Sequence, residues 1–271
     1  MKRSPGAACC ILTLVVMSGA VRADDGPYSV NKALNISSIA WDTVVDDYRE
    51  FYSMDRLKRM GIAFAGGAVI ANTHADALFQ KWYQTDIRGT TTNDFADISK
   101  NFGESRYLLP VTLATAVLDN VLEGTVYNST VGRWGKRAVR AYLLGAPLLW
   151  AAQNITGASR PAVNRGSDWR PFKDSHGVSG HAYVGAVPFL VMADMADDNK
   201  WLRTLFYAAS TAAALSRIND NAHYLSQAAL GWYLAWESTD TVLDRDNREQ
   251  SYAVQPMMLE DGYGVSVSMQ W

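Results

Sequence analysis

Cysteine is scarce in this sequence and is confined to one place. The chain has 271 residues and two cysteines, Cys9 and Cys10, which lie inside an apolar run at 7–16. That run follows two basic residues and ends in small residues up to Ala23, which is the pattern of a secretory signal peptide. We expect cleavage after Ala23 and export to the periplasm. The remaining chain has no cysteine, which excludes a disulfide framework.

An excess of positive charge is also missing. The full sequence has a formal net charge of −2, and removal of residues 1–23 takes away three of its 25 basic residues. The remainder has 22 basic against 27 acidic residues, a formal charge of −5. A chain with this balance has no overall field that attracts polyanions, which argues against nucleic acid as a partner. An anionic ligand would have to be bound by a local group of cations.

Long uninterrupted apolar runs are absent as well. Apolar residues recur at the three- and four-residue spacing of amphipathic helices. Helices are predicted at 35–52, 60–71, 74–88, 108–122, 131–154, 180–195, 201–215 and 222–237, and a polar loop at 90–93. None of them holds 18 clean apolar residues, and charges or amides interrupt nearly all. This favours a soluble helical bundle over a polytopic membrane protein. Peripheral contact with a membrane remains open.

The character of the sequence changes after residue 237. Residues 240–250 are highly charged and are interpreted as a linker. Apolar and small or polar residues then alternate on both sides of Asp261-Gly262, which predicts a β-hairpin. The predicted organisation is a signal peptide at 1–23, a helical domain at 24–239, and a linker with a hairpin at 240–271. The fold class is all-α with a short C-terminal β-hairpin.

Residues 216–227, here the His223 patch, are the most informative stretch. A helix-breaking cluster at 219–221 predicts that one helix ends near Arg217 and another starts near Ala222. His223 would then lie in a first helical turn, where backbone amides favour an anion. Arginine fits a phosphate, and histidine is a nucleophile or proton carrier near neutral pH. A surface salt link with a helix cap is the alternative, but the combination indicates phosphoryl chemistry.

Two further patches have residues of the same kind. In residues 177–181, the His181 patch, a Ser-Gly pair opens a helix, and His181 could hand over a proton to an anion bound there. In residues 153–161, the Arg160 patch, a proline fixes the backbone after Arg160 at the end of a helix. Each patch alone has an ordinary interpretation, as a turn with a core histidine or as a helix end.

In this order and spacing, the three patches resemble the signature of the type 2 phosphatidic acid phosphatase superfamily, which also contains bacterial class A acid phosphatases and vanadium-dependent haloperoxidases. The family pattern has a Lys separated by six residues from Arg-Pro, then Pro-Ser-Gly-His. It ends with Ser-Arg, five residues, His, three residues and Asp. The resemblance covers roughly residues 150–235.

The resemblance implies a function and a set of site residues. His223 would attack phosphorus to form a phosphohistidine, His181 would protonate the leaving oxygen, and Gln227 would orient the nucleophile. The phosphate oxygens would be held by Arg160, Arg217, Gln153, Ser179 and Gly180. No cofactor and no metal is needed in that scheme. The substrate would be a phosphorylated small molecule or a lipid phosphate or diphosphate.

The sequence departs from the family pattern at three positions. They are Gln153 in place of Lys, Val178 in place of Pro and Gln227 in place of Asp. A neutral amide stabilises an imidazolium less than a carboxylate does, so a slower enzyme or a different pH optimum is expected. Asp220 is a possible stand-in for the missing Asp, and Lys173 or Arg165 for the missing Lys.

Two other functions are compatible with the sequence. One is a non-catalytic anion-binding or envelope-structural protein with a degenerate site, which the two glutamines support. The other is a vanadate-dependent peroxidase, because it would share the anion-binding residues. Of the remaining histidines, His176 is close enough in sequence to line the site, and His74 is interpreted as a helix-cap or surface residue.

Overall fold

The computed structural model describes residues 41–121, 130–259 and 262–269. The chain divides into two units after Thr43, and nearly all described residues belong to the second. Residues 41–51 form a helix. The other helical elements are α2 (Met54–Ala71), α3 (Ala75–Trp82), the π-helix η1 (Tyr83–Ile87), α4 (Thr90–Ser99), the 3₁₀ turn η2 (Lys100–Gly103), α5 (Ser105–Val121), α6 (Thr130–Thr156), the 3₁₀ turn η3 (Pro161–Val163), α7 (Gly180–Met195), α8 (Lys200–Ser210), α9 (Ala212–Asn219) and α10 (Leu225–Ser251).

The all-α prediction is confirmed for this helical part of the chain. Strands β1 (Tyr252–Leu259) and β2 (Gly262–Met269) pair antiparallel, with Tyr252 opposite Met269. The predicted signal peptide at 1–23 lies outside the described residues. The domain boundaries at 23 and 239 remain predictions.

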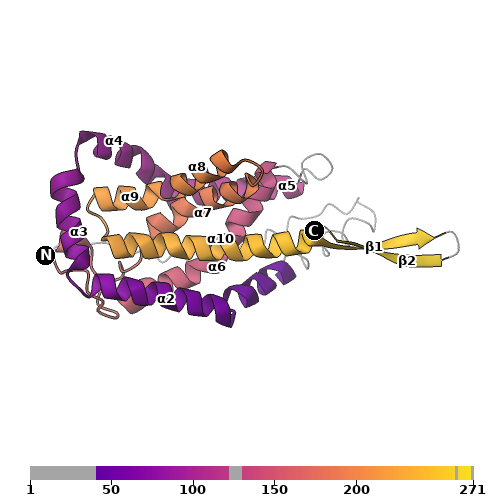
Figure 1. The fold of residues 1–271 in the computed structure, drawn as a ribbon, viewed down its shortest axis with the longest axis horizontal. Helices are drawn as coiled ribbons and strands as arrows, with labels where there is room; N and C mark the ends of the chain where they lie inside the picture. The colour runs from indigo at the N-terminus through magenta and orange to yellow at the C-terminus, as the bar shows by residue number, and fades with distance from the viewer. Residues whose placement is uncertain (1–40, 122–129, 260–261, 270–271) are drawn as a thin grey trace, which may run out of the picture. The chain divides into compact units, whose positions relative to one another are not determined.

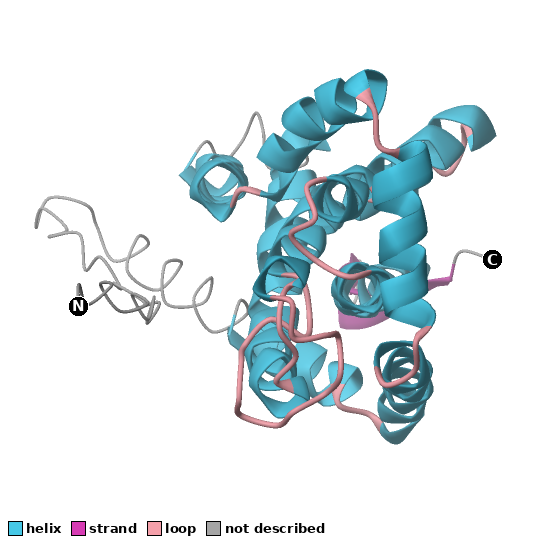
Figure 2. Ribbon diagram, turned by 90° about the vertical axis from the view of Figure 1, so that its left-hand side faces the viewer, coloured by secondary structure: helices cyan, strands magenta, loops and turns pink. Residues whose placement is uncertain are grey.

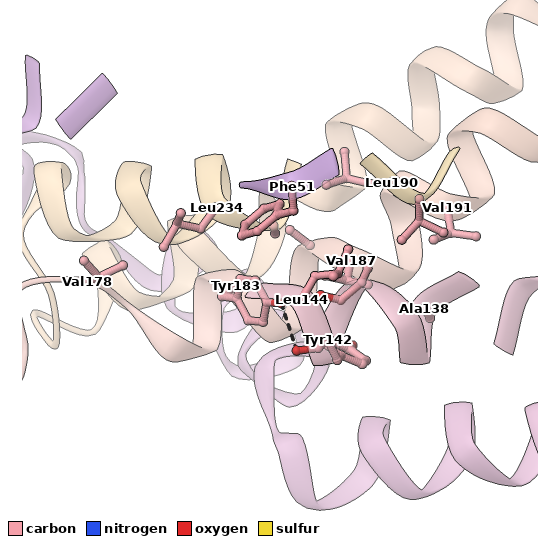
Figure 3. Packing of buried hydrophobic residues seen from close by; sticks show 14 of the residues in the cluster. Phe51, Ala138, Tyr142, Leu144, Val178, Tyr183, Val187, Leu190, Val191 and Leu234 are labelled. Atoms are coloured by element: carbon pink, nitrogen blue, oxygen red, sulfur yellow. Dashed lines mark hydrogen bonds between the residues drawn. The ribbon is translucent and has the colours of Figure 1, made fainter. Parts of the chain in front are cut away.

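Helix α10 is the element on which the others pack. It contacts α2, α6, α7 and α9, and it runs lengthwise through the bundle (Figure 1). Figure 3 shows the core between these helices, where Phe51, Leu144, Tyr183 and Leu234 interdigitate. The Tyr183 hydroxyl donates a hydrogen bond to the Ala141 carbonyl at 2.8 Å, so its polar atom is satisfied in the core. These contacts hold α7 against α6 and α10.

Glycine is required where α6 crosses α7. A Cβ atom on Gly145 would lie 2.3 Å from the Tyr183 hydroxyl oxygen, which is far inside van der Waals contact. Any side chain at this position would push the two helices apart. The close approach of α6 and α7 therefore depends on Gly145.

The prediction that a helix ends near residue 237 is wrong, because α10 continues to Ser251 through the segment interpreted as a charged linker. Acidic residues of this segment pair with an arginine of α2. Arg56, which is 3% exposed, donates to Glu237 Oε1 at 3.0 Å, Asp240 Oδ2 at 2.9 Å and Asp244 Oδ2 at 2.6 Å. The charged segment is therefore one face of a helix and not a solvated linker. The arginine that pairs with its carboxylates lies about 180 residues away in the sequence.

Helix α6 contributes a second group of ion pairs to the same half of α10. Arg137 Nε lies 2.9 Å from Asp246 Oδ2, and Arg140 Nη1 lies 2.6 Å from Asp246 Oδ1. Arg140 also forms two bonds of 2.7 Å to the buried carboxylate of Asp47. The basic start of α6 is thus neutralised inside the fold.

The polar segment at 90–93 is helical, contrary to the prediction of a loop. Helix α4 begins at Thr90, and the Thr92 hydroxyl accepts a hydrogen bond from the Gly89 amide at 2.9 Å. Threonine in the first turn can satisfy an otherwise open backbone donor, which offsets its weak helix propensity. The predicted helix at 201–215 is divided at Thr211 into α8 and α9.

In the described part of the chain, no single helix is long and apolar enough to cross a membrane. By length and composition alone, α2 and the α3–η1 segment that follows it are together long and apolar enough to cross a membrane, as a pair bent by 69°.

Candidate active site

The three patches singled out in the sequence meet at one end of the helical body. Figure 2 views the molecule from the end where α10 begins and where connecting loops lie. Hydrogen bonds link the patches to one another. The Gln153 amide nitrogen donates to the Val178 carbonyl at 3.0 Å, and the Ser179 backbone amide donates to the Gln227 carbonyl at 2.9 Å. The Gln227 amide nitrogen donates to the Ser159 carbonyl at 2.8 Å.

His223 lies just outside α10 rather than in its first turn. The helix begins at Leu225, later than the predicted start near Ala222. Asn221 has a φ of +54°, a left-handed conformation that asparagine tolerates, and this turn separates α9 from α10. The His223 backbone amide donates to the Arg217 carbonyl at 3.1 Å, so the residue is fixed to the end of α9 by its backbone as well as by its side-chain contacts.

The imidazole of His223 contacts the amide of Gln227. His223 Nδ1 lies 2.9 Å from Gln227 Oε1, and both residues are buried, with exposures of 4% and 0%. An amide oxygen only accepts hydrogen bonds, so Nδ1 must carry the proton of the neutral ring. Nε2 then has a free lone pair. In this tautomer the ring presents a nucleophile on the side away from Gln227.

The orientation of the Gln227 amide is fixed by its other partners. Its oxygen also accepts from the Tyr224 backbone amide at 3.1 Å, while its nitrogen donates to the Ser159 carbonyl. A flipped amide would place its NH₂ group against the Tyr224 N–H and its oxygen against the Ser159 carbonyl oxygen. The hydrogen-bond network therefore determines which nitrogen of His223 is protonated.

His223 is neutral over a wide pH range. Burial lowers its pKa to about 3, and the positive charges of Arg160 and Arg217 act in the same direction, while the hydrogen bond that the ring donates to Gln227 opposes them. The His176 ring lies edge-on to it, with 6.5 Å between ring centroids, and so His176 does line the site. His74 is exposed at the start of α3 and does not belong to this group.

Two guanidinium groups face the histidines. The Nε atoms of Arg160 and Arg217 are buried and have no hydrogen-bond partner among the described residues. Arg217 Nη1 lies 3.5 Å from Asp220 Oδ2. Burial lowers the pKa of Arg217, and the charge of Arg160 adds to that effect. Two nearby cations with open donors are poised to bind an oxyanion, which would relieve their repulsion.

The start of α7 completes this side of the site. Ser179 caps the helix, and its hydroxyl oxygen accepts from the Ala182 amide at 3.3 Å. The amides of the first helical turn have no acceptor within the helix, which favours an anion at Gly180 and His181. Gln153 lies beside this turn, since a Cβ on Gly180 would be 3.6 Å from its amide nitrogen. Gln153 contributes no charge and braces the loop through the Val178 carbonyl.

None of the three residues suggested as replacements for the missing Lys and Asp of the family pattern has a contact with the His223 ring among the interactions of the described residues. Asp220 pairs with Arg217, while the contacts of the His223 ring are with Gln227 and His176. Lys173 and Arg165 are exposed. The positive charge that acts on His223 therefore comes from Arg160 and Arg217.

Sequence reasoning missed Glu104 and Asp76. Glu104 Oε1 lies 3.3 Å from His181 Nε2. Asp76, which is fully buried in α3, accepts a 3.0 Å bond from the Ser226 amide and a second bond from its hydroxyl. A carboxylate at this position caps α10 two residues after the candidate nucleophile. Both residues lie more than 70 positions from their partners, so no local spacing could reveal them.

The chain is similar to proteins of one superfamily. Residues 139–241 match the family model of the PAP2 superfamily, and this range contains all three patches. The chain is also similar to the crystal structure of the first transmembrane PAP2 type phosphatidylglycerolphosphate phosphatase from Bacillus subtilis. The identity is 14%, the alignment covers 78% of this chain and 96% of that chain, and the TM-score is 0.46. A comparison with curated proteins gives no match. The predicted resemblance is confirmed, and residues 139–241 carry the sequence pattern of the PAP2 superfamily.

Proposed function

We propose that this protein is an exported phosphatase that hydrolyses a phosphate ester of the lipid phosphate type through a phosphohistidine on His223. The observation that carries the proposal is the bond between His223 Nδ1 and Gln227 Oε1, because it leaves Nε2 free. Sequence similarity to the PAP2 superfamily over residues 139–241 supports the same chemistry.

The proposed reaction has two steps. His223 Nε2 attacks phosphorus while the P–O bond to the leaving group breaks, and His181 gives its proton to the leaving oxygen. A water molecule then attacks phosphorus and gives a proton to His181 while the P–N bond to His223 Nε2 breaks, which releases phosphate and restores the free histidine. Arg160, Arg217 and the amides at the start of α7 stabilise the charge on the equatorial oxygens in both steps. No step in this scheme requires a metal.

The scheme predicts an acidic pH optimum. The nucleophile must be neutral, and the pKa of His223 is about 3. The proton donor must be charged, and burial together with Arg217 lowers the pKa of His181 below its usual value of 6.5. The rate kcat/KM should therefore rise above about pH 3 and fall before neutrality. A profile that keeps rising to pH 8 would contradict this assignment of roles.

A lipid substrate is supported by the resemblance and by the surface of α5. Apolar side chains on this helix are about half exposed, namely Tyr107 (53%), Val111 (50%), Leu113 (54%) and Val117 (49%). Exposed apolar side chains that gather on one helix are typical of contact with a membrane surface. We propose peripheral contact at the periplasmic face of the membrane, with the substrate reached from that surface.

The test is phosphate release by the purified mature protein with no added metal. Substrates are an aryl phosphate, phosphatidic acid and a polyprenyl diphosphate, each with wild type and His223→Ala. The control is His74→Ala, which removes an exposed histidine. Quenching in base after reaction with a ³²P-labelled substrate should trap a base-stable, acid-labile label in wild type and in the control. No label in His223→Ala is expected, and release that persists in that variant would refute the proposal.

The alternatives give different results in the same assay. A non-catalytic anion-binding protein would bind phosphate or vanadate without releasing phosphate from any ester. A vanadate-dependent peroxidase would oxidise halide with peroxide only after vanadate is supplied.

A further inference from the structure

The carboxylate of Glu104 lies beside the proposed proton donor. Its Oε1 is 3.3 Å from His181 Nε2, and the two side chains are 31% and 35% exposed. Glu104 stands between η2 and α5 and belongs to none of the three patches. It is a carboxylate at the solvent-facing edge of the site, on the side of His181, whereas Asp220 pairs with Arg217.

The backbone fixes the position of Glu104. A Cβ on the preceding Gly103 would lie 2.9 Å from the His181 carbonyl and 3.0 Å from its Cβ. A Cβ on Gly185 would lie 2.8 Å from the Phe102 carbonyl. The η2 turn is therefore packed directly on the first two turns of α7. Glu104 therefore lies beside His181 because the main chain next to it is packed against α7.

Three charged groups act on the His181 ring. Glu104 raises its pKa, while Arg217 and Arg160 lower it together with burial. The carboxylate also raises the pKa of Arg217, so it faces the guanidinium as well as the imidazole. Arg106 Nε is 3.5 Å from Glu104 Oε2, but that arginine side chain is 69% exposed and its charge is screened by solvent.

We propose that Glu104 sets the substrate class of the site: it favours phosphate monoesters, whose leaving group is a neutral alcohol, over diphosphates, whose leaving group is an anionic phosphate. The inference rests on the proposed phosphohistidine chemistry. In that reaction the leaving oxygen takes its proton from His181, whose Nε2 faces Glu104 Oε1 at 3.3 Å, so it lies no farther from the carboxylate than the opposite side of the imidazole ring. An alcohol brings no charge to this position. A departing phosphate is negatively charged and is repelled by the Glu104 carboxylate, which slows the reaction of a diphosphate.

The expected discrimination is large enough to measure. Two like charges a few ångströms apart at a partly exposed position oppose each other enough to change a rate about tenfold. Glu104→Gln removes the charge and keeps the shape of the side chain. It should raise the ratio of kcat/KM for a diphosphate to that for a monophosphate by about tenfold.

The test compares geranyl monophosphate with geranyl diphosphate, which share one alkyl chain and differ in leaving group. Wild type, Glu104→Gln and Glu104→Asp are assayed beside Asp97→Asn, which removes an exposed carboxylate of α4 that pairs with Lys100. We expect the ratio to change in Glu104→Gln and to stay near the wild-type value in Glu104→Asp and Asp97→Asn. In Glu104→Gln the alkaline limb of the pH profile for geranyl monophosphate should move to lower pH, because the imidazolium of His181 loses its counter-charge.

The outcomes separate this inference from the proposal on which it rests. If wild type releases no phosphate from either ester, or if release survives His223→Ala, the proposed function fails and the inference falls with it. If release depends on His223 but the ratio and the pH profile are unchanged in Glu104→Gln, the inference alone is overturned. An equal change of the ratio in Asp97→Asn would also overturn it, since the effect would then be one of net charge.

Discussion

Acidification should destabilise this protein through His223, and the structure gives the size of the effect. The ring is 4% exposed, and burial lowers its pKa from 6.5 to about 3 in the folded chain. Between these two values the unfolded chain binds a proton that the folded chain does not. The free energy of unfolding therefore falls as the pH falls through this window. At pH 7 the histidine is mostly neutral in both states, and its contribution there is small.

The expected loss of unfolding free energy is about 2 kcal/mol between pH 7 and pH 5. At pH 5 the solution is about 1.5 pH units below the pKa of the histidine in the unfolded chain, and each unit contributes about 1.4 kcal/mol. Urea unfolding followed by circular dichroism at both pH values measures it. The buffer must be free of phosphate, since an anion bound at Arg160 and Arg217 would stabilise the folded state. His223→Asn should lose about 2 kcal/mol less than wild type over the same interval.

A control variant isolates the effect of this one ring. His74→Asn removes an exposed histidine and should lose as much stability on acidification as wild type. His176 and His181 also have pKa values lowered by burial, but they are present in every variant and their contribution cancels. Equal losses in wild type and His223→Asn would refute the reasoning, because they would mean that the ring can be protonated in the folded state.

Three further substitutions test other parts of the structure. Gln227→Glu places a carboxylate at His223 Nδ1 and should raise the pKa of the ring, so that the acid limb of the kcat/KM profile moves to higher pH. Arg56→Leu leaves Glu237, which is 0% exposed, with one arginine fewer, and should lower the free energy of unfolding in urea by about 3 kcal/mol. Gly157 has a φ of +57° and no room for a Cβ atom, so Gly157→Ala should lower the melting temperature by about 5 °C or more.

The sequence predicts the helical class and the meeting of the three patches. Amphipathic spacing is a local property, so the helices at 180–195 and 131–154 were expected at nearly their observed places. The patches were expected to converge because they match one family pattern, and Gln227 was expected beside His223 because it stands in place of the family's Asp. The roles of these residues in catalysis remain predictions.

The errors have a common physical origin. The charged segment after residue 237 was interpreted as a linker because its partners, Arg56 and Arg140 among them, lie on helices far away in the sequence. Glu104 was overlooked because only the packing of Gly103 on α7 brings it to His181. Local patterns do not contain information about charges that meet only after the chain has folded.

The two halves of α10 are held by different forces, and their local stability should differ accordingly. The half next to the candidate nucleophile is fixed by a buried cap and by apolar packing, through Asp76 and Leu234. From Asp244 onward the helix is held largely by ion pairs, whose acidic members Asp244 and Asp246 are 49% and 17% exposed. Added salt screens such pairs and leaves apolar packing intact. Hydrogen exchange along this one helix should therefore quicken with ionic strength at its end and stay constant at its beginning, so that the site keeps its geometry while the far end frays.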